Sequence, residues 1–497
     1  MQTAYTVVSE KPVEVWIPGK LLEDRLDAEF YQPVYLRTVE ALKSAGFPLR
    51  PLQKLSSYKS RVYWGIKGLD EPISSTHIPY IRPNEATDDG WIEYDDLTTI
   101  ERHWANDMPG ALVQPGDLLV EVKGNARKVH VVREDVPSLT FVSGSMYRFV
   151  PKNDVDVHYL WAYLTSQTCQ TLKERLMSNS IIKWINPDDI CQMSVLVPPR
   201  PLQTYIGAKV RLAEQCRRNG RELDQETEGF FDRILKRLSP TSNSVQTNAI
   251  EPSEIVTERL DAKFYQSIYI DIERYIVTHP EGYKTIGELV SSISNGVEYR
   301  DFVADGIPYL TVGNIRDGRL DLENAPKIPN DPSIPERGKI KANDILIVRT
   351  GSIGQSAFVR IDDSEAIISS HFIRLRLKQP QQAPWIVFFL NSWAGKLLQE
   401  RITYGAVQPQ IGQELLMGLP IPNIGADNSK YISAIVQKQY MLFDKATKLT
   451  KAAKADVEAL IEGRLDVAGI MDGRLQPPTW PSIQQELSLT KSVSEPV

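Results

Sequence analysis

A nine-residue segment near the beginning of the chain returns in its second half. Residues 24–32 read Asp-Arg-Leu-Asp-Ala-Glu-Phe-Tyr-Gln, and residues 258–266 read Glu-Arg-Leu-Asp-Ala-Lys-Phe-Tyr-Gln. Further matches follow in the same order, pairing 78–81 with 307–310, 116–120 with 343–347, 161–166 with 387–392, 172–176 with 398–402, and 197–198 with 421–422. The offset drifts only from 234 at the first match to 224 at the last. Small loop insertions between two homologous domains produce such a drift, so the chain is predicted to be an internal duplication.

Both repeats are predicted to be α+β domains built on a mixed β-sheet. Apolar residues from Tyr265 to Ile276 recur at three- and four-residue spacing, which predicts an amphipathic helix after the second copy of the motif. Short β-branched runs at 344–349 and 356–360 flank the turn 351–354 and predict a hairpin. A helix at 385–401 and a strand ending at Pro422 complete the predicted domain.

A long helix is predicted after each domain. The heptad seam of the second helix comprises Ile435, Gln439, Leu442, Ala446, Leu449, Ala453 and Leu460, and that of the first comprises Ile206, Ala213, Gly220, Thr227 and Ile234. The two helices are expected to pair as an antiparallel coiled coil that serves as a spacer, with a plain helical packing hairpin as the alternative. The predicted plan is a first domain over 1–199, a helix over 200–238, a linker over 239–252, a second domain over 253–424, a helix over 428–465 and a mobile tail over 476–497.

Composition predicts an ordinary folded protein of more than one domain. The 497 residues exceed what one hydrophobic core supports, and the 42% apolar and 24% charged residues are usual for soluble proteins. The first 20 residues lack the apolar stretch of a secretory signal, and the longest apolar run, 385–390, is far shorter than the ~20 residues of a membrane span. A cytoplasmic protein without membrane contact is therefore expected. Three cysteines without CxxC spacing predict neither a disulfide framework nor a zinc site.

The net charge of −6 counts against nucleic-acid binding, because phosphate contacts normally leave a basic excess. DNA binding remains compatible with this net charge if basic residues are concentrated locally at the contact surface. The clusters are Lys123, Arg127, Lys128 and Arg133 in the first repeat, and Arg300, Arg316, Arg319, Lys339 and Lys341 in the second.

The repeated plan resembles the specificity subunits of type I restriction-modification systems, over nearly the whole chain. Its marks in the second repeat are Arg-Leu-Asp-Ala-x-Phe-Tyr at 259–265, Asp-Ile-Leu-Ile-x-x-x-Gly-Ser-Ile-Gly at 344–354, and Gly-Ala-Val-Gln-Pro-Gln-Ile at 405–411 leading into Leu-Pro-Ile-Pro at 419–422. The first repeat departs from this pattern, because residues 124–127 read Gly-Asn-Ala-Arg and residues 179–184 read Asn-Ser-Ile-Ile-Lys-Trp.

The resemblance implies a DNA-binding subunit with no catalytic centre of its own. Each target-recognition domain would read one half of a bipartite double-stranded DNA site, and the helices would fix the gap between the halves. The implied partners are two methyltransferase (modification) subunits, directed to adenine-containing half-sites, and a restriction nuclease that translocates DNA in the full complex. The implied roles are DNA methylation and phage defence. A helical interaction scaffold that does not read DNA is the alternative from another class.

The sequence lacks most of the common catalytic motifs. The sequence has no GxGxxG, no GxxxxGK[ST] and no Asn/Asp-Pro-Pro-aromatic motif, so no nucleotide or methyl-donor cofactor is predicted. Asp117, Glu121 and Lys123 have the order of a magnesium-dependent nuclease site, in which the carboxylates would hold the metal. The second repeat has Val348 and Thr350 where the first has Glu121 and Lys123, which disfavours the nuclease hypothesis. No metal site is predicted.

Candidate DNA contacts follow from side-chain chemistry, because Arg and Lys read guanine while Asn and Gln read adenine. The candidates in the first repeat are Tyr63, Trp64, Lys67, Arg82, Asn84, Lys123, Asn125, Arg127, Lys183 and Trp184. The candidates in the second repeat are Asn295, Arg300, Asn314, Arg316, Arg349, Ser352, Tyr404, Gln408 and Gln410. Arg-Leu-Asp recurs unchanged at 25–27 and 259–261, which predicts a structural ion pair or a shared docking surface, since readers of different bases would not keep identical residues.

Overall fold

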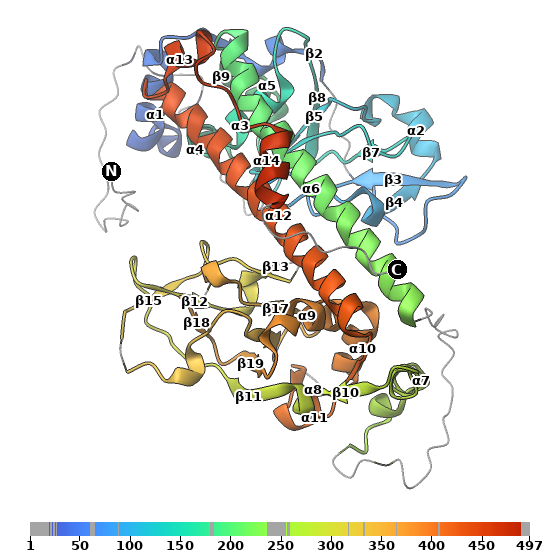
Figure 1. The fold of residues 1–497 in the computed structure, drawn as a ribbon. Helices are drawn as coiled ribbons and strands as arrows, with labels where there is room; N and C mark the ends of the chain where they lie inside the picture. The colour runs from blue at the N-terminus through green and yellow to red at the C-terminus, as the bar shows by residue number, and fades with distance from the viewer. Residues whose placement is uncertain are drawn as a thin grey trace. The chain divides into compact units, whose positions relative to one another are not determined.

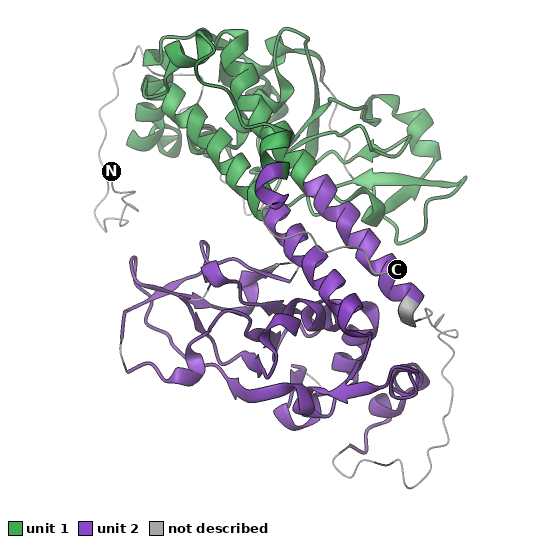
Figure 2. Cartoon of the chain, viewed as in Figure 1, with its two compact units in different colours: residues 1–216, 444–484 green, residues 217–443, 485–497 purple. Residues whose placement is uncertain are grey.

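The computed structural model divides the chain into two compact units (Figure 2). Unit 1 comprises Met1–Cys216 and Asp444–Gln484, and unit 2 comprises Arg217–Phe443 and Gln485–Val497. The residues that the structure describes are 19, 22, 25, 27–59, 65–87, 89–178, 183–235, 255, 259–316, 318–331, 333–363, 365–405 and 408–488, without the side chains of Tyr58, Ile234, Leu235 and Arg316. Each unit therefore combines one sequence repeat with part of the helix that follows the other repeat.

Unit 1 contains a four-stranded antiparallel sheet of order β2-β8-β5-β6, a three-stranded sheet β4-β3-β7 and a two-stranded sheet β1-β9 (Figure 1). Strands β3 and β7 are parallel, which makes the second sheet mixed. The strands are β1 (Leu49–Pro51), β2 (Ser56–Lys59), β3 (His77–Ile81), β4 (Thr99–Glu101), β5 (Leu118–Glu121), β6 (Val129–Val131), β7 (Phe141–Val142), β8 (Met146–Pro151) and β9 (Ser194–Leu196).

Unit 2 repeats this topology strand for strand. Its sheets have the orders β11-β19-β16-β17, β15-β12-β18 and β10-β22, and β12 and β18 form the parallel pair. The strands are β10 (Tyr283–Thr285), β11 (Val290–Asn295), β12 (Ile307–Leu310), β15 (Lys327–Ile328), β16 (Ile345–Val348), β17 (Ser356–Phe358), β18 (Ile367–Ile368), β19 (Phe372–Leu377) and β22 (Pro420–Pro422), with two added hairpins, β13 (Ile315–Arg316) with β14 (Arg319–Leu320) and β20 (Thr403–Tyr404) with β21 (Gln410–Ile411). The predicted duplication and the α+β class are confirmed.

The helix expected over 385–401 is two helices, α9 (Ala383–Asn391) and α10 (Trp393–Arg401). Ser392 has an extended backbone between them, and its hydroxyl accepts a hydrogen bond from the Gly395 amide at 3.3 Å. Ser166 does the same in unit 1, where it separates α3 (Val157–Thr165) from α4 (Gln167–Leu176). A serine that caps a new helix start thus interrupts a pattern that reads as one helix. The other helices are α1 (Pro33–Ser44), α2 (His103–Asp107), α5 (Pro187–Gln192), α7 (Ser267–Val277), α8 (Ile286–Leu289), α11 (Gln413–Met417) and α13 (Val467–Met471).

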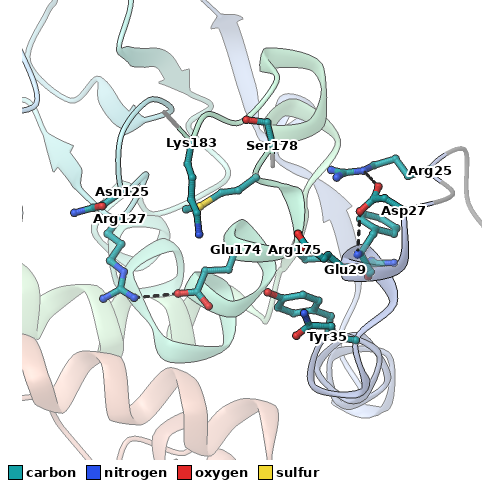
Figure 3. Close-up of a pocket in the computed structure, with 13 residues that line it drawn as sticks. Arg25, Asp27, Glu29, Tyr35, Asn125, Arg127, Glu174, Arg175, Ser178 and Lys183 are labelled. Atoms are coloured by element: carbon teal, nitrogen blue, oxygen red, sulfur yellow. Dashed lines mark hydrogen bonds and ion pairs between the residues drawn. The ribbon is translucent and has the colours of Figure 1, made fainter. Parts of the chain in front are cut away.

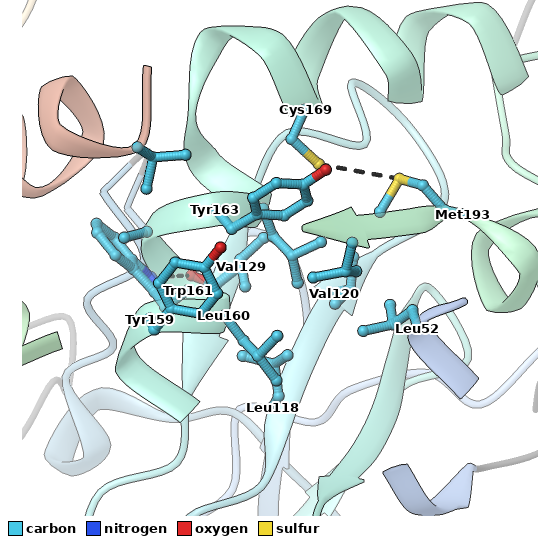
Figure 4. Close-up of a cluster of buried hydrophobic side chains, with 14 of the residues drawn as sticks. Leu52, Leu118, Val120, Val129, Tyr159, Leu160, Trp161, Tyr163, Cys169 and Met193 are labelled. Carbon is cyan, nitrogen blue, oxygen red and sulfur yellow. Dashed lines mark hydrogen bonds between the residues drawn. The ribbon is translucent and has the colours of Figure 1, made fainter. Parts of the chain in front are cut away.

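The core of unit 1 is organised around the aromatic residues of α3 (Figure 4). Tyr159 and Tyr163 are fully buried, and their hydroxyls donate to the carbonyls of Leu196 at 2.6 Å and Ser194 at 2.9 Å. The indole Nε1 of Trp161 donates to the Val129 carbonyl at 2.9 Å. Each large ring is thus buried with its polar atom satisfied, which removes the main penalty of burying it.

Two long helices, α6 (Arg200–Leu235) and α12 (Ala426–Ile461), contribute residues to both units. In unit 2 they run antiparallel, because Gly220 of α6 faces Phe443 while Glu226 accepts a hydrogen bond from the Tyr431 hydroxyl at 2.6 Å. In unit 1, Lys209 of α6 pairs with Asp456 of α12. All seven predicted seam residues of α12 are buried, as are Ile206, Ala213, Gly220 and Thr227 of α6. The predicted antiparallel pairing is confirmed.

The last part of the chain contains a helix that the sequence did not indicate. Within the stretch 476–497, expected to be a mobile tail, α14 spans Trp480–Ser488, with Ile483 and Leu487 buried. Trp480, Ile483 and Leu487 recur at helical spacing, a pattern too short to stand out from the polar residues around it. The linker predicted over 239–252 lies outside the described residues.

Candidate nucleic-acid interface

The two recurring motifs of each repeat contact each other. In unit 1, Arg25 pairs with Asp27 at 2.9 Å, and Arg175 donates from Nε to the Phe30 carbonyl at 3.0 Å while its guanidinium lies over the Phe30 ring. In unit 2, Arg259 pairs with Asp261 at 2.7 Å, and Arg401 makes the same two contacts with Phe264. The Arg25 and Arg259 guanidiniums hold the pKa values of Asp27 and Asp261 below the ordinary range. The two recurring motifs are therefore packed against each other in the same way in both units, and the predicted structural ion pair is present in both copies.

Two loops of unit 1 that carry predicted contact residues are joined by backbone hydrogen bonds. The Gly124 amide donates to the Lys183 carbonyl at 2.9 Å, and the Ile185 amide donates to the Val122 carbonyl at 2.8 Å. Lys123 and Trp184 form the antiparallel bridge between these two strands of chain. Segments about sixty positions apart in the sequence thus present their side chains together.

Unit 2 builds the same pair of loops from the corresponding residues. Thr350 and Gln410 form the bridge, and the Ile411 amide donates to the Arg349 carbonyl at 2.9 Å. Tyr404 is joined to the pair through the short hairpin β20–β21, in which it lies opposite Gln410. We call the segments 122–127 with 183–185 and 349–354 with 403–405 and 408–411 the loop pairs of the two units.

Buried acidic side chains support the loop pair of unit 1. One carboxylate oxygen of Glu121, which is 5% exposed, accepts hydrogen bonds from the amides of Arg127 at 3.0 Å and Lys128 at 3.1 Å. Asp117 forms a buried ion pair with Arg148 at 2.6 Å and accepts from the Gln114 amide. Both carboxylates of the nuclease hypothesis are therefore engaged in holding the backbone and in an internal ion pair. Asp344 of unit 2 accepts from the Lys341 amide and from Arg376 in the same manner.

Three predicted contact residues of unit 1, Asn125, Arg127 and Lys183, line one pocket of about 700 Å³ (Figure 3). All three are exposed, and they come from both members of the loop pair. The pocket is also lined by Arg25, Asp27 and Glu174, so both basic and acidic groups surround it. Trp184, another predicted contact residue, follows on the same loop with 40% of its surface exposed, so its ring is accessible for stacking.

The remaining predicted residues of unit 1 lie on another segment. Arg82 pairs with Glu85 through Nε at 2.9 Å and Nη2 at 2.6 Å, and this carboxylate raises the pKa of Arg82. Asn84 and Lys67 are exposed. Tyr63 and Trp64 lie outside the described residues.

In unit 2 the structure brings together most of the predicted residues of the loop pair. Tyr404 is 45% exposed and its hydroxyl lies 3.5 Å from Gln410 Oε1, while Gln408 and Ser352 are exposed and Arg349 is half-buried. Asn295, at the end of β11, accepts a hydrogen bond from Gln413 Nε2 at 2.8 Å.

Two predictions in unit 2 need correction or cannot be followed. Asn314 is 6% exposed, and its side-chain oxygen accepts hydrogen bonds from the amide and hydroxyl of Thr311, so it shapes its own turn and is not presented outward. Arg316 ends β13, and its side chain is not among those that the structure describes. Arg300 is 84% exposed and paired with Glu298 at 2.6 Å.

The basic cluster expected around residues 123–133 is only partly a surface patch. Lys128 Nζ donates to the carbonyls of Pro83 and Ala86, at 2.9 and 2.6 Å. The Arg133 side chain is 4% exposed, pairs with Asp135 and stacks on Trp91. Half of the cluster is therefore internal, because linear spacing does not reveal which basic residues face inward. The sequence also missed Glu174, which pairs with Arg127 at 3.0 Å, although it lies in the repeated segment 172–176.

No helix in the described part of the chain is long and apolar enough to cross a membrane. Among the same residues, no group of three or more His, Cys, Asp or Glu side chains is arranged to hold a metal ion.

No family model matches the chain. Over 277 residues, which cover 51% of this chain and 54% of the relative, it is 26% identical to the type I restriction enzyme EcoBI specificity subunit of Escherichia coli. The chain thus spans about half the length of this curated relative. Among solved structures, the match to the type I restriction-modification S subunit from M. genitalium covers 85% of this chain and 96% of that subunit, with 13% identity and a TM-score of 0.41. The match to the HsdS subunit from Thermoanaerobacter tengcongensis covers 84% of this chain and 97% of that subunit, with 16% identity and a TM-score of 0.28. The sequence match agrees with the resemblance drawn from the repeated motifs, and over the matched residues the chain is similar to a specificity subunit of a type I restriction-modification system.

Proposed function

We propose that this chain is a DNA specificity subunit whose two units each read one half of a bipartite double-stranded site through their loop pairs. In this proposal the chain has no catalytic centre of its own and directs two methyltransferase subunits, and in the full complex a restriction nuclease, to that site. The observation that carries the proposal is the recurrence of one loop pair at the corresponding place in both units, with different side chains.

The contrast between framework and loops supports this assignment. The residues that hold each unit together, such as Arg25 with Asp27 and Arg259 with Asp261, are identical in the two copies. The residues that the loop pairs expose differ, with Asn125, Arg127, Lys183 and Trp184 in unit 1 and Ser352, Tyr404 and Gln408 in unit 2. A shared frame with divergent exposed groups is what two readers of different base sequences require.

The exposed groups have the chemistry for base and phosphate contact. Arginine offers a planar fork to guanine O6 and N7, asparagine and glutamine match adenine N6 and N7, and lysine and serine donate to phosphates. Trp184 and Tyr404 add exposed aromatic faces. The acidic net charge is compatible with this because the proposed contacts are local.

Joining two DNA-recognition units in one chain would raise their combined affinity for a two-part site. When one half-site is bound, the second unit searches only the DNA within its reach, so its effective concentration is high if the spacing fits. We propose that the paired helices α6 and α12 set this spacing and thereby make the gap length part of the recognised site.

The test is a genome-wide map of methylated bases in the host with and without this gene, with the partner methyltransferase expressed. The expected result is the loss of one split motif with a fixed gap. An unchanged map would overturn the proposal and favour a helical scaffold that does not read DNA.

Point variants assign the halves of the motif to the units. Arg127→Ala is expected to alter the bases read in one half, and Gln408→Ala those read in the other. Arg274→Ala is the matched control, because Arg274 is an exposed arginine on α7 with 61% of its side chain accessible, and α7 belongs to neither loop pair. If Arg274→Ala changed the motif as much as Arg127→Ala, the assignment to the loop pairs would be wrong.

A further inference from the structure

One residue of the unit 1 loop pair, Arg127, is held by a single face of helix α4. Gln170 Nε2 donates to the Arg127 carbonyl at 3.1 Å, and Lys173 Nζ donates to the same carbonyl at 3.2 Å. The carboxylate of Glu174 accepts a hydrogen bond from Arg127 Nη2 at 3.0 Å (Figure 3). Positions 170, 173 and 174 lie three and four residues apart, so they share one face of the helix. We call these three residues the α4 anchor.

The fourth attachment of Arg127 comes from the sheet below. Its amide donates to Glu121, which is nearly fully buried. The amide, the carbonyl and the guanidinium of one residue are therefore all bonded to fixed elements. Ala126, directly before it, is buried with a positive φ of 51°, a conformation that non-glycine residues rarely adopt without such support.

In unit 2 the corresponding described residues of α10 bond to other groups. Gln399, which corresponds to Lys173, donates to the carbonyls of Leu390 and Gly395 within its own helical region. Glu400, which corresponds to Glu174, pairs with Lys263 of the recurring motif at 3.1 Å. The same helix position thus serves the contact loop in unit 1 and the framework in unit 2.

We infer that Gln170, Lys173 and Glu174 are positioning residues that fix Arg127 as a specificity-determining contact of the first recognition unit. This inference rests on the proposed function and adds to it which arginine reads the first half-site and what orients it.

The geometry leaves Arg127 able to bind while it is oriented. Its side chain is 67% exposed, and only Nη2 is engaged by Glu174, so the other guanidinium N–H groups remain available to a planar acceptor pair such as guanine O6 and N7. Orienting the side chain before binding removes rotamer entropy that the complex would otherwise lose. The acidic group beside it also disfavours a simple phosphate contact, since Glu174 repels phosphate oxygens.

Lys173 shows how firmly the backbone of this loop is tied. The residue is fully buried, and burial lowers its pKa from 10.5 to about 8. Its retention in the core is explained by the carbonyl of Arg127, the one described hydrogen-bond acceptor that its ammonium reaches.

The test uses the full chain in complex with its methyltransferase and duplexes carrying the mapped site. For each variant, the initial methylation rate on the cognate duplex is divided by the rate on a duplex with one base pair replaced in the first half-site, and then in the second. For Glu174→Gln we expect the first ratio to fall roughly threefold to fivefold, the range of an exposed ion pair, and the second ratio to stay unchanged. Arg127→Lys is expected to lower the first ratio roughly tenfold while leaving the salt dependence of DNA binding unaltered, because it keeps the charge and loses the fork.

Glu400→Gln is the matched control, since it removes the corresponding ion pair in unit 2 and should change neither ratio. Retained methylation of the cognate duplex shows that each variant is folded. An unchanged first ratio in Glu174→Gln, or an equal fall in both ratios, would overturn the inference. Failure of the wild-type complex to discriminate in either half would instead overturn the proposed function.

Discussion

The buried pair between Lys209 of α6 and Asp456 of α12 gives a quantitative test of what holds unit 1 together. The two side chains are only 10% and 17% exposed, and they are in direct contact. Burial raises the pKa of Asp456 even though the Lys209 ammonium beside it acts in the opposite direction. Desolvation thus exceeds attraction at this carboxylate, and the pair is not expected to add net stability.

Replacing one partner of the pair should destabilise unit 1 much more than replacing both. Breaking a buried pair costs about 3–5 kcal/mol. The residual exposure of these two side chains should bring the cost of Lys209→Met or Asp456→Leu slightly below that range, to about 2–3 kcal/mol. The double variant replaces both charges by apolar groups of similar size and should lie within about 1 kcal/mol of the wild type.

The pH dependence follows from the same pair. In Lys209→Met the folded-state pKa of Asp456 stays above its ordinary value of 3.8, so the unprotonated form is disfavoured in the folded state. A raised carboxyl pKa makes stability fall as pH rises, so the deficit of this variant should be largest at pH 7 and smaller at pH 5.

Native-state hydrogen exchange of the α6 and α12 peptides is the suitable assay, because a chain of two units does not unfold in one two-state step. If the double variant lost as much stability as the two single variants together, the two side chains would be energetically uncoupled, and the reasoning from an unpaired buried charge would be refuted.

Three further predictions concern other parts of the chain. Burial lowers the pKa of His130 to about 4, and its neutral ring is hydrogen-bonded to the Gly90 carbonyl and the Tyr94 hydroxyl. Unit 1 should therefore lose up to about 3 kcal/mol of folding stability as pH falls from 6.5 to 4. A His130→Gln variant that kept this loss in pH-dependent hydrogen exchange would contradict the assignment to His130. A Cβ at Gly220 would lie 3.0 Å from Phe443 Cζ, so Gly220→Leu should cost about 1–3 kcal/mol in unit 2 by overpacking, whereas a gain in thermal stability would show that the ring can move aside. Inserting seven residues into each of α6 and α12 keeps the heptad seam in phase and lengthens the helix pair by about 10 Å. If the helices set the gap, the gap of the methylated motif should then lengthen by about three base pairs. An unchanged gap would assign the spacing to another element.

The sequence predicted the fold well wherever periodicity or repetition carried the information. The ordered matches between the two halves anticipated two units of one topology, and the heptad residues Ile435 to Leu460 are buried as expected. The break at Ser392 escaped prediction because the apolar pattern continues across it, and only the capping geometry reveals the interruption.

The candidate interface was predicted at the level of loops and less well at the level of side chains. Arg127 and Lys183 do share a pocket, but Lys128 and Arg133 of the same run face inward. Residue type and linear spacing do not distinguish a lysine that donates to buried carbonyls from one in solvent. Glu174 and Lys173 were missed because their roles depend on a contact with residue 127, more than forty positions away.

The way in which α12 completes unit 1 sets the order in which the chain can fold during synthesis. Ala453, Val457 and Leu460 belong to the same core as Tyr159 and Leu202, and Lys209 and Asp456 are separated by 247 positions. At roughly 5–20 residues per second, translation of that interval takes on the order of 10 to 50 s. The described residues of the main core cluster of unit 2 all precede Phe443, whereas unit 1 must keep an uncovered apolar stripe until α12 emerges. The repeat that is made first is therefore the one that finishes folding last, and during that interval it is the part of the nascent chain that depends most on protection from aggregation.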